Sequence, residues 1–417
     1  MHYAEMSLGR LQEEYDQSLA RYQAYQGMGL SLNISRGKPG AEELSHSNGL
    51  LTCLSETDYT AEDGTDCRNY GGLDGLPEMK RLLAQLLDVA PEEVIVGGNA
   101  SLSLMFNCLS DLAALKKDRP LKFICPAPGY DRHFFMCQFF GIEMLTVSMS
   151  PTGPDMDRVE ELAKDPDTVG MWCVPVFSNP QGYTYSDDTI RRLAAMPTAH
   201  PGFRLFWDNA YTVHHFRGAR PQPLSIMDAC REYGNPDRPL LFTSFSKISF
   251  GGAGVCGVAA SAPNRAAILK RLAVQTVGPD KINQLRHVRF YKDLNGVLAH
   301  MGALAKIIRV KFDCADAVFS RCIADTGAGE WTRPDGGYFL TFDTLPGCAK
   351  RTVALCKDAG LILTDAGAVF PYGKDPQDRC LRVCPTFVSV EELELALQIF
   401  CEAVKLVALE KFLNNGN

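Results

Sequence analysis

The residue best suited to covalent chemistry is Lys247, which lies in the segment SFSKISFGGAGVCG directly after the apolar run PLLFT. That run predicts a buried strand, so the lysine stands at a strand end among small residues and glycines. A largely apolar site disfavours the charged form of a lysine, which leaves its amine free to attack an aldehyde. We therefore interpret Lys247 as a residue that forms Schiff bases, although a lysine taken alone is more often an ordinary loop residue.

The glycines after this lysine allow a second interpretation. Gly252, Gly254 and Gly257 satisfy the GxGxxG pattern of dinucleotide-binding folds. That pattern joins a first strand to a helix, whereas here the next residues, VAASAP, are typical of another strand. The dinucleotide interpretation is the weaker one, and the glycines are explained by the room that they leave around Lys247.

Composition excludes several classes of protein. The 417 residues are 46% hydrophobic and 22% charged, as in globular proteins, and no apolar run approaches the ~20 residues of a membrane span. The net charge of -7 argues against a nucleic-acid partner. The first residues lack the features of a secretory signal, which predicts a cytoplasmic protein, and the 15 scattered cysteines predict neither a disulfide framework nor a metal site.

The elements that must position Lys247 follow from hydrophobic patterning. Between about residues 70 and 275, short apolar runs alternate with helical patterns, which predicts a doubly wound α/β domain with a mostly parallel sheet. Ligands of such sheets bind at the carboxyl ends of the strands. The predicted strands are VIVGG, KFICPAP, MWCVPVF, FRLFWD, PLLFTSFS and GVCGVAAS.

The pattern changes after residue 280. A long helical stretch is followed by the predicted strands GGYFLTFD, AGLILTD and CLRVCP and by a terminal amphipathic helix. An amphipathic helix over residues 5–26 is expected to return to this part of the chain. We predict a large domain of residues 46–300 and a smaller α+β domain of residues 1–45 and 301–417.

Nine segments in this order resemble the signature segments of the aspartate aminotransferase superfamily, the fold type I enzymes that use pyridoxal phosphate. They are YGGLDGLPEMKRLL, VIVGGNASL, PAPGYDRH, VFSNPQGY, WDNAYTVHH, SFSKISFGGAG, PDGGYFL, DAGAVF and CLRVCPTF. The resemblance implies a mostly parallel sheet of the seven-stranded type, flanked by helices, with a smaller α+β domain. It also implies pyridoxal 5'-phosphate bound to Lys247.

The same resemblance gives roles to residues around the cofactor ring. Asp208 is placed beside the ring nitrogen, where a carboxylate favours the charged pyridinium. Tyr211 and Asn179 are placed as hydrogen-bond donors to the phenolate oxygen, Tyr130 stacks on the ring, and His133 hydrogen-bonds Asp208. Lys247, Asp208 and Tyr211 are thus the predicted catalytic residues.

The cofactor phosphate requires backbone donors at a helix start, which GGNAS supplies. The predicted phosphate site consists of Gly98, Asn99, Ala100, Ser101 and Ser244. Tyr70 resembles a tyrosine that reaches the phosphate of the neighbouring subunit, which implies a homodimer with shared active sites. Val255 stands where many members carry a phosphate-binding arginine, so a cation from GPDKINQLRHVRF, or helix dipole and hydroxyls alone, must replace it.

For the substrate, Arg382 matches the arginine that grips the α-carboxylate in a two-pronged fashion. Gly37 and Asn179 are expected to line the substrate. Five cations are candidates for a distal carboxylate: Arg36, Lys38, Lys281, Arg286 and Arg289. We expect an aminotransferase that acts on L-aspartate and 2-oxoglutarate.

Two alternatives remain open at this point. The same fold and lysine serve lyases, so a carbon–sulfur β-lyase acting on a cysteine-like substrate is the nearest competing enzyme. An aminotransferase-like regulatory effector domain is the alternative without catalysis, and the acidic chain leaves little room for a DNA-binding module.

Overall fold

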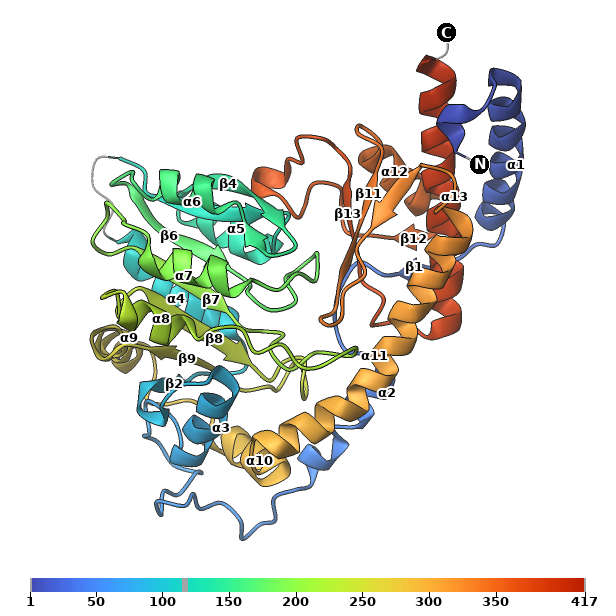
Figure 1. Cartoon of the computed structure of the whole chain (residues 1–417). Coiled ribbons are helices and arrows are strands. Elements are labelled where there is room, and N and C mark those ends of the chain that lie inside the picture. Colours follow the sequence, from blue (N-terminus) through green and yellow to red (C-terminus); the bar gives the residue numbers. More distant parts are fainter. Residues whose placement is uncertain (1, 115–118, 416–417) are drawn as a thin grey trace.

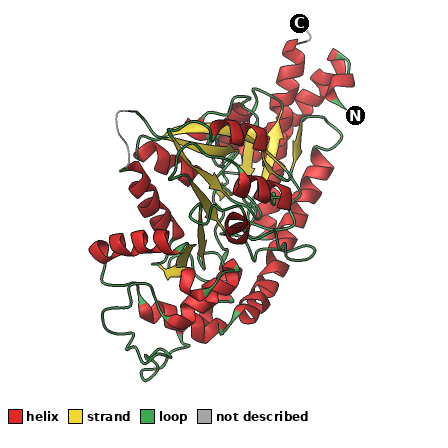
Figure 2. Cartoon of the chain, turned by 60° about the vertical axis from the view of Figure 1, so that its left-hand side comes forward, coloured by secondary structure: helices red, strands yellow, loops and turns green. Residues whose placement is uncertain are grey.

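A computed structural model describes residues 2–114 and 119–415 of the chain, and Figure 2 shows its strands enclosed by helices. The strands are β1 (Leu32–Asn33), β2 (Val94–Val96), β3 (Lys122–Ala127), β4 (Glu143–Ser150), β5 (Gly153–Pro154), β6 (Thr168–Cys173), β7 (Arg204–Asp208), β8 (Pro239–Ser244), β9 (Cys256–Ala260), β10 (Gly329–Trp331), β11 (Leu340–Thr344), β12 (Leu361–Ile362) and β13 (Cys380–Val383). The α-helices are α1 (Leu8–Gln26), α2 (Ala41–Ser45), α3 (Pro77–Leu87), α4 (Ser101–Ala113), α5 (Asp131–Phe139), α6 (Met156–Leu162), α7 (Asp187–Ala195), α8 (Ile226–Glu232), α9 (Ala262–Gln275), α10 (Lys281–Tyr291), α11 (Leu294–Cys322), α12 (Ala349–Asp358) and α13 (Val390–Asn415).

The large sheet has the strand order β2-β9-β8-β7-β6-β3-β4-β5. Strands β8, β7, β6, β3 and β4 run parallel, whereas β9 is antiparallel to both of its neighbours and the two-residue β5 is antiparallel to β4. The predicted fold class is confirmed, with β5 as an added edge strand. Because β9 is antiparallel to β2 and to β8, the carboxyl end of β2 lies at the same edge as the ends of the parallel strands.

Helices bury both faces of this sheet, because successive side chains along a strand point to opposite faces. On β7, Phe206 belongs to the apolar cluster that includes residues of α4, α5 and α9. Its neighbours Leu205 and Trp207 belong to the cluster that includes residues of α3, α6, α7 and α8. Burial on both faces explains why these strands read as continuous apolar runs, and it leaves the carboxyl ends of the strands for a ligand.

Two elements differ from the sequence patterns. The apolar runs above do not include β4, in which only Met144 and Val147 of eight residues are buried. The helical stretch after residue 280 is two helices, because Lys292 adopts a left-handed φ of 67° and the side chain of Asp293 caps α11 by accepting from the N–H of Gly296. Gly296 is required there, since an added Cβ would meet the carbonyl oxygen of Tyr291.

The rest of the chain surrounds two smaller sheets, the antiparallel β10-β11-β13 and the parallel pair β1-β12. Helices α1 and α13 pack side by side, so the two ends of the chain lie together, and α11 runs along the molecule toward α10 (Figure 1). The predicted domain boundary at residue 300 falls inside α11, which is one continuous helix, so the division into two domains stays a prediction.

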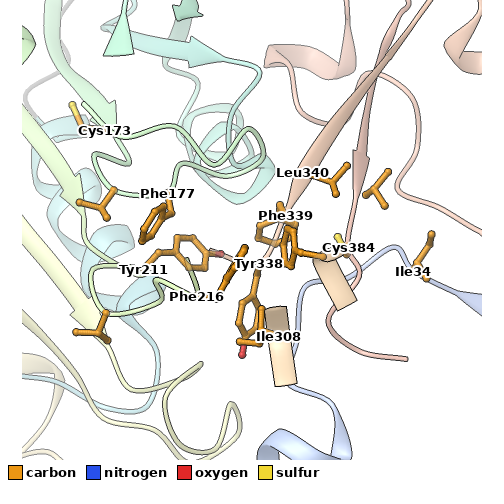
Figure 3. Packing of buried hydrophobic residues seen from close by; sticks show 14 of the residues in the cluster. Ile34, Cys173, Phe177, Tyr211, Phe216, Ile308, Tyr338, Phe339, Leu340 and Cys384 are labelled. Carbon is orange, nitrogen blue, oxygen red and sulfur yellow. The ribbon is translucent and has the colours of Figure 1, made fainter. Parts of the chain in front are cut away.

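Aromatic side chains fill the space between the strand ends of the large sheet and β11. Figure 3 shows Phe177 and Tyr211 on one side and Tyr338 and Phe339 on the other. The ring centroids of Tyr211 and Phe339 are 6.2 Å apart in an edge-to-face arrangement, and those of Tyr211 and Tyr338 are 6.3 Å apart. This packing fixes the position of β11 and its neighbour β13 relative to the large sheet.

Candidate active site

Side chains from the carboxyl ends of several strands meet at one cavity of about 230 Å³. Asp208 is the last residue of β7 and Ser244 the last residue of β8, and Tyr130 and Asn179 follow β3 and β6. Parallel strands bring their carboxyl ends to one edge, so residues far apart in the chain become neighbours. The cavity is lined by Ala100, Ser101, Leu102, Tyr130, Val174, Asn179, Asp208, Ala210, Tyr211, Ser244, Ser246, Lys247 and Gly251.

Lys247 reaches into this cavity from the loop after β8. Its Nζ lies 5.1 Å from the centre of the Tyr211 ring. Burial lowers the pKa of Lys247, and the carboxylate of Asp208 opposes that shift. The direction favours a neutral amine, which is the form that acts as a nucleophile or base.

The main chain of Lys247 is held from behind the cavity. Its carbonyl oxygen lies 3.3 Å from Nε2 of His214 and accepts a hydrogen bond of 3.4 Å from the hydroxyl of Tyr338. Burial, together with the charge of Lys247, lowers the pKa of His214 to about 3, so this imidazole is neutral and can donate from Nε2. The hydroxyl of Tyr338 also donates to Glu43, at 2.6 Å. These contacts hold the main chain of the lysine, and His214, Tyr338 and Glu43 were not among the predicted site residues.

Asp208 is buried, with 5% of its surface exposed, and its two carboxylate oxygens have different surroundings. Oδ2 lies 3.2 Å from Nε2 of His133, whose ring stacks on Trp172 with centroids 4.1 Å apart. Neither Oδ1 nor the nearby Nε2 of His133 has a hydrogen-bond partner among the residues that the structure describes, so the predicted hydrogen bond from His133 is not formed in this geometry. A buried carboxylate oxygen without a partner is costly, so the geometry suits a cationic N–H group brought by a ligand.

Tyr211 and Tyr130 add aromatic surface to the cavity. Burial raises the pKa of both hydroxyls, and for Tyr211 the pKa lies well above its ordinary value. Both phenols therefore keep their proton at neutral pH, and the hydroxyl of Tyr211 is a hydrogen-bond donor. Asn179, with 3% of its surface exposed, brings a side-chain amide to the same cavity.

The start of α4 provides backbone donors on one side of the cavity. Ala100 precedes the helix and makes no side-chain cap, and the N–H of Ser103 donates to its carbonyl at 3.1 Å, which leaves the N–H groups of Ser101 and Leu102 to a ligand or solvent. Two hydrogen bonds join the loop of Asn99 to the glycine-rich loop. The hydroxyl of Ser246 donates to the carbonyl of Asn99 at 3.1 Å, and the side-chain amide of Asn99 donates to the carbonyl of Gly252 at 3.3 Å. Helix start and glycine-rich loop together make an anion cradle.

No arginine is among the described residues that line the cavity. Val255, at the position where a phosphate-binding arginine was considered, is buried with 2% of its surface exposed and belongs to the apolar core. Ser244 and Ser246 supply hydroxyl groups beside the helix start. An anion here is therefore met by main-chain N–H groups, hydroxyls and the positive end of α4.

Arg382 lies on β13, which pairs with β11, and only 8% of its surface is exposed. All of its polar contacts are long: Nη1 is 3.4 Å from Oδ1 of Asn179 and 3.6 Å from Asp131, and Nη2 is 3.4 Å from the hydroxyl of Thr364. Its Nε has no partner among the described residues. The guanidinium is therefore held loosely at the side of the cavity where Asn179 lies, with donors available for a carboxylate.

The ring of Phe339 lies close both to Arg382 and to the loop of Gly37. The guanidinium carbon of Arg382 lies 5.1 Å from the centre of the Phe339 ring, and a Cβ added to Gly37 would meet the far edge of the same ring. Only glycine fits at position 37, which brings the main chain of this loop against the ring. The neighbouring Arg36 is exposed, and its side chain forms no ion pair or hydrogen bond within residues 2–114 and 119–415.

The other cations predicted to bind substrate have partners within this chain. Nζ of Lys38 lies 4.0 Å above the ring of Phe387. Lys281 is buried and donates to the carbonyls of Asn69 and Gly71. None of these groups lines the cavity in this subunit.

The two arginines of α10 also have contacts of their own. Arg286 donates to Asn283 at 2.6 Å and to the carbonyl of Ala253 at 3.4 Å. Arg289 pairs with Asp58 at 3.1 Å. Tyr70, predicted to act in a neighbouring subunit, is 85% exposed and lies outside the cavity of its own chain.

Some residues that line the cavity were not predicted as site residues. Ser246, Ala210 and Gly251 stand beside predicted residues in the quoted segments, so their proximity in the chain was a usable signal. Leu102 lies in the first turn of α4, where backbone donors alone had been considered. Val174 follows β6, and its apolar side chain gives no indication in the sequence that it lines a site. Among the described residues no group of His, Cys, Asp or Glu side chains could hold a metal ion, and no helix is long and apolar enough to cross a membrane.

The chain is similar to known proteins over nearly its whole length. A family model described as "Aspartate amino-transferase" matches residues 6–415. An aspartate aminotransferase of Corynebacterium glutamicum is 43% identical over 92% of this chain and 91% of its own length. A solved structure of an aspartate transaminase from the same species superimposes with a TM-score of 0.96 at 40% identity and covers 99% of both chains. A putative aminotransferase of Mycolicibacterium smegmatis is 45% identical over 98% of this chain and 99% of its own length.

Proposed function

The chain belongs to the aspartate aminotransferase family and is an aminotransferase, and from this premise we propose that it uses pyridoxal 5'-phosphate to move an amino group between L-aspartate and 2-oxoglutarate. The observation that carries this proposal is the pair formed by Lys247 and Asp208 at one cavity. Burial favours the neutral amine of the lysine, while the carboxylate keeps one buried oxygen without a partner. An aldehyde with a protonated ring nitrogen complements both groups.

The residues of the cavity fit this cofactor. When bound, pyridoxal phosphate supplies an aldehyde for the substrate amine and a ring that takes up electrons from Cα. Oδ1 of Asp208 is suited to accept from the ring nitrogen, and Tyr211 and Asn179 are suited to donate to the ring oxygen. Tyr130 offers an aromatic face.

The phosphate of the cofactor is assigned to the start of α4. The proposed donors are the main-chain N–H groups of the loop before α4 and the hydroxyls of Ser101 and Ser244, together with the positive end of the helix. The loop is formed by Gly98, Asn99 and Ala100. No arginine is needed in this arrangement, which accounts for the valine at position 255.

Lys247 is the proposed base of the reaction. Its amine would hold the cofactor aldehyde, and in its free neutral form it would take the proton from Cα of the substrate. The contacts of its main-chain carbonyl with His214 and Tyr338 keep this side chain directed into the cavity. The amine must be neutral to accept the proton from Cα of the substrate, and burial favours that state.

Arg382 is the proposed anchor of the α-carboxylate. Its loose contacts and unpartnered Nε leave a fork of N–H donors for a carboxylate oxygen pair. For the distal carboxylate we propose Arg36 as the first candidate, because Arg289 is paired with Asp58. A dicarboxylate substrate agrees with the name of the Corynebacterium glutamicum relative.

We also propose that the protein is a homodimer with shared active sites and that it is cytoplasmic. Tyr70 is almost fully exposed, as expected of a side chain that acts in a second subunit. An exposed aromatic surface formed by Phe106, Phe135 and Phe139 adjoins Leu102, which also lines the cavity. A second copy of the chain is the proposed occupant of this surface, because burial there brings the partner next to the cofactor site.

The test is the absorption spectrum of the protein loaded with cofactor, recorded before and after L-aspartate alone is added. We expect the band of the bound aldehyde form to give way to that of the aminated form, 2-oxoglutarate to reverse the change, and Lys247→Ala to abolish it. The outcome that contradicts the proposal is a band that ignores L-aspartate while a cysteine-like substrate releases pyruvate, since that is the behaviour of a carbon–sulfur lyase.

A further inference from the structure

Lys281 is a buried charged residue whose ammonium is held by main-chain carbonyl oxygens. Only 4% of its surface is exposed, and its Nζ donates to the carbonyl oxygens of Asn69 at 2.6 Å and of Gly71 at 2.7 Å. No carboxylate lies within ion-pair distance of this ammonium among residues 2–114 and 119–415. Burying an ammonium is costly unless strong acceptors receive its protons, so the two carbonyls must be held firmly in place.

The two carbonyls belong to the residues on either side of Tyr70. The carbonyl of Asn69 belongs to the peptide group directly before Tyr70, and that of Gly71 to the peptide group between Gly71 and Gly72. A single ammonium therefore holds the main chain on both sides of the Tyr70–Gly71 pair, which restricts the torsions that direct the tyrosine. The N–H of Tyr70 adds a third restraint by donating to the side-chain oxygen of Asn69 at 2.8 Å. Despite these restraints on its main chain, the side chain of Tyr70 is 85% exposed.

The loop before α10 supports the same segment from the other side. The N–H of Gly71 donates to the carbonyl of Val277 at 3.1 Å. A Cβ added to Gly278, whose φ is 137°, would lie 2.6 Å from the carbonyl oxygen of Gly71. The two loops therefore touch main chain to main chain, and Lys281 begins the helix that follows the second loop.

We propose that Lys281 is a positioning residue, which presents the hydroxyl of Tyr70 to the cofactor phosphate of a second subunit. This inference rests on the proposed function, because it needs both the cofactor and the homodimer. An exposed tyrosine on a free loop loses side-chain and main-chain entropy when it binds, and a loop that is already fixed avoids most of that loss. Lys281 then affects binding of the cofactor, without contact between its own ammonium and the substrate.

The test compares full-length proteins that carry Tyr70→Phe, Lys281→Met or both changes. The quantity measured is the dissociation constant of pyridoxal 5'-phosphate from each apoprotein, followed by fluorescence. We expect each single change to raise this constant by about tenfold, the loss of one hydrogen bond to a charged group, and the double change to raise it no further. Lys80→Met is the matched control, because Lys80 binds the side chain of Asp74 in the same loop at 2.6 Å; its constant should stay near that of the parent.

Substrate kinetics separate positioning from direct recognition. A positioning role changes the KM values for L-aspartate and L-alanine by the same factor at saturating cofactor. A rise in KM for L-aspartate alone, with unchanged cofactor affinity, overturns the proposal and makes Lys281 a ligand of the distal carboxylate.

The remaining outcomes are equally decisive. If Tyr70→Phe weakens cofactor binding and Lys281→Met does not, the positioning role is wrong although the phosphate contact stands. If Tyr70→Phe has no effect, the phosphate contact and the positioning role both fail, while aminotransfer from L-aspartate is judged separately by the absorption test. Should Lys281→Met not fold, Gly278→Ala displaces Gly71 and keeps the lysine; an unchanged dissociation constant in that variant overturns the proposal.

Discussion

Nε2 of His133 lies 3.2 Å from Oδ2 of Asp208, while the other oxygen of this carboxylate, Oδ1, is buried without a partner among the described residues. The stacked ring of Trp172 fixes the imidazole, and the imidazole occupies one side of the carboxylate. Nε2 of His133 also lacks a hydrogen-bond partner among the described residues, so the buried carboxylate can still accept a hydrogen bond from a ligand. A carboxylate arranged in this way can hold a proton on a ring nitrogen without being able to turn away from it.

The first prediction concerns the charge of Asp208. Asp208→Asn keeps the shape of the side chain but removes the negative charge that stabilises a protonated ring, so we expect kcat to fall by about 10²–10³-fold. Rapid mixing with L-aspartate measures the rate, and a fluorescence titration should show that the cofactor still binds. A variant with the kcat of the parent protein contradicts the assigned role.

The second prediction concerns the stability of the apoprotein. Burial lowers the pKa of Lys247, so folding at neutral pH either removes a proton that the unfolded chain keeps or buries a charge. Lys247→Met removes this cost and should raise the free energy of unfolding by about 0.5–2 kcal/mol.

The same reasoning gives the sign of its pH dependence. The advantage of Lys247→Met should be largest below the folded-state pKa and shrink as the pH rises toward the ordinary lysine pKa, because the unfolded wild-type chain then loses its proton as well. Urea unfolding of both apoproteins at several pH values measures the difference. An equal difference at every pH is inconsistent with a lowered pKa.

The third prediction concerns the hydroxyl of Tyr211. Burial raises the pKa of Tyr211 well above its ordinary value, so it stays a donor across the working pH range. A donor to the phenolate oxygen lowers the proton affinity of the bound cofactor. Tyr211→Phe should therefore move the pH at which the absorption of the bound cofactor changes upward by about one unit, the equivalent of one hydrogen bond. A downward shift contradicts the assignment.

The fourth prediction separates the two substrate carboxylates. Arg382→Lys replaces a two-pronged donor by a point charge, and it should raise KM by about tenfold or more for L-aspartate and L-alanine alike. Arg36→Gln should raise KM for L-aspartate and leave L-alanine unchanged, with Arg289→Gln as its control. If Arg289→Gln has the selective effect instead, the distal carboxylate is bound by α10 of one of the two subunits.

The strand-end residues show what could be predicted from the chain alone. Asp208, Ser244 and Lys247 follow apolar runs that predict parallel strands, and parallel strands must gather their carboxyl ends at one edge. Their convergence on one cavity therefore needs only the strand pattern. Strand β4 was missed, because only Met144 and Val147 of its eight residues are buried, which leaves no continuous apolar run.

The cations of α10 show the opposite case. Arg286 and Arg289 carry the charge that a distal carboxylate needs, but a helix points successive side chains in different directions, and the break at Lys292 alters how α10 continues into α11. Arg289 meets Asp58, a partner more than two hundred residues away in the chain. Such a pairing depends on how two loops pack, which no local pattern encodes.

The sequence by itself determined the family and the alternation of strands and helices, and it singled out the lysine that we propose as the base, because these follow from local patterns of burial and residue type. Only the tertiary structure decided which polar groups are available to bind a ligand. It left Oδ1 of Asp208 without a partner, loosened the contacts of Arg382 and engaged Lys281 with the main chain beside Tyr70. Hydrogen bonds and burial depend on atoms brought together from distant segments, so the availability of a side chain is settled only when the chain has folded.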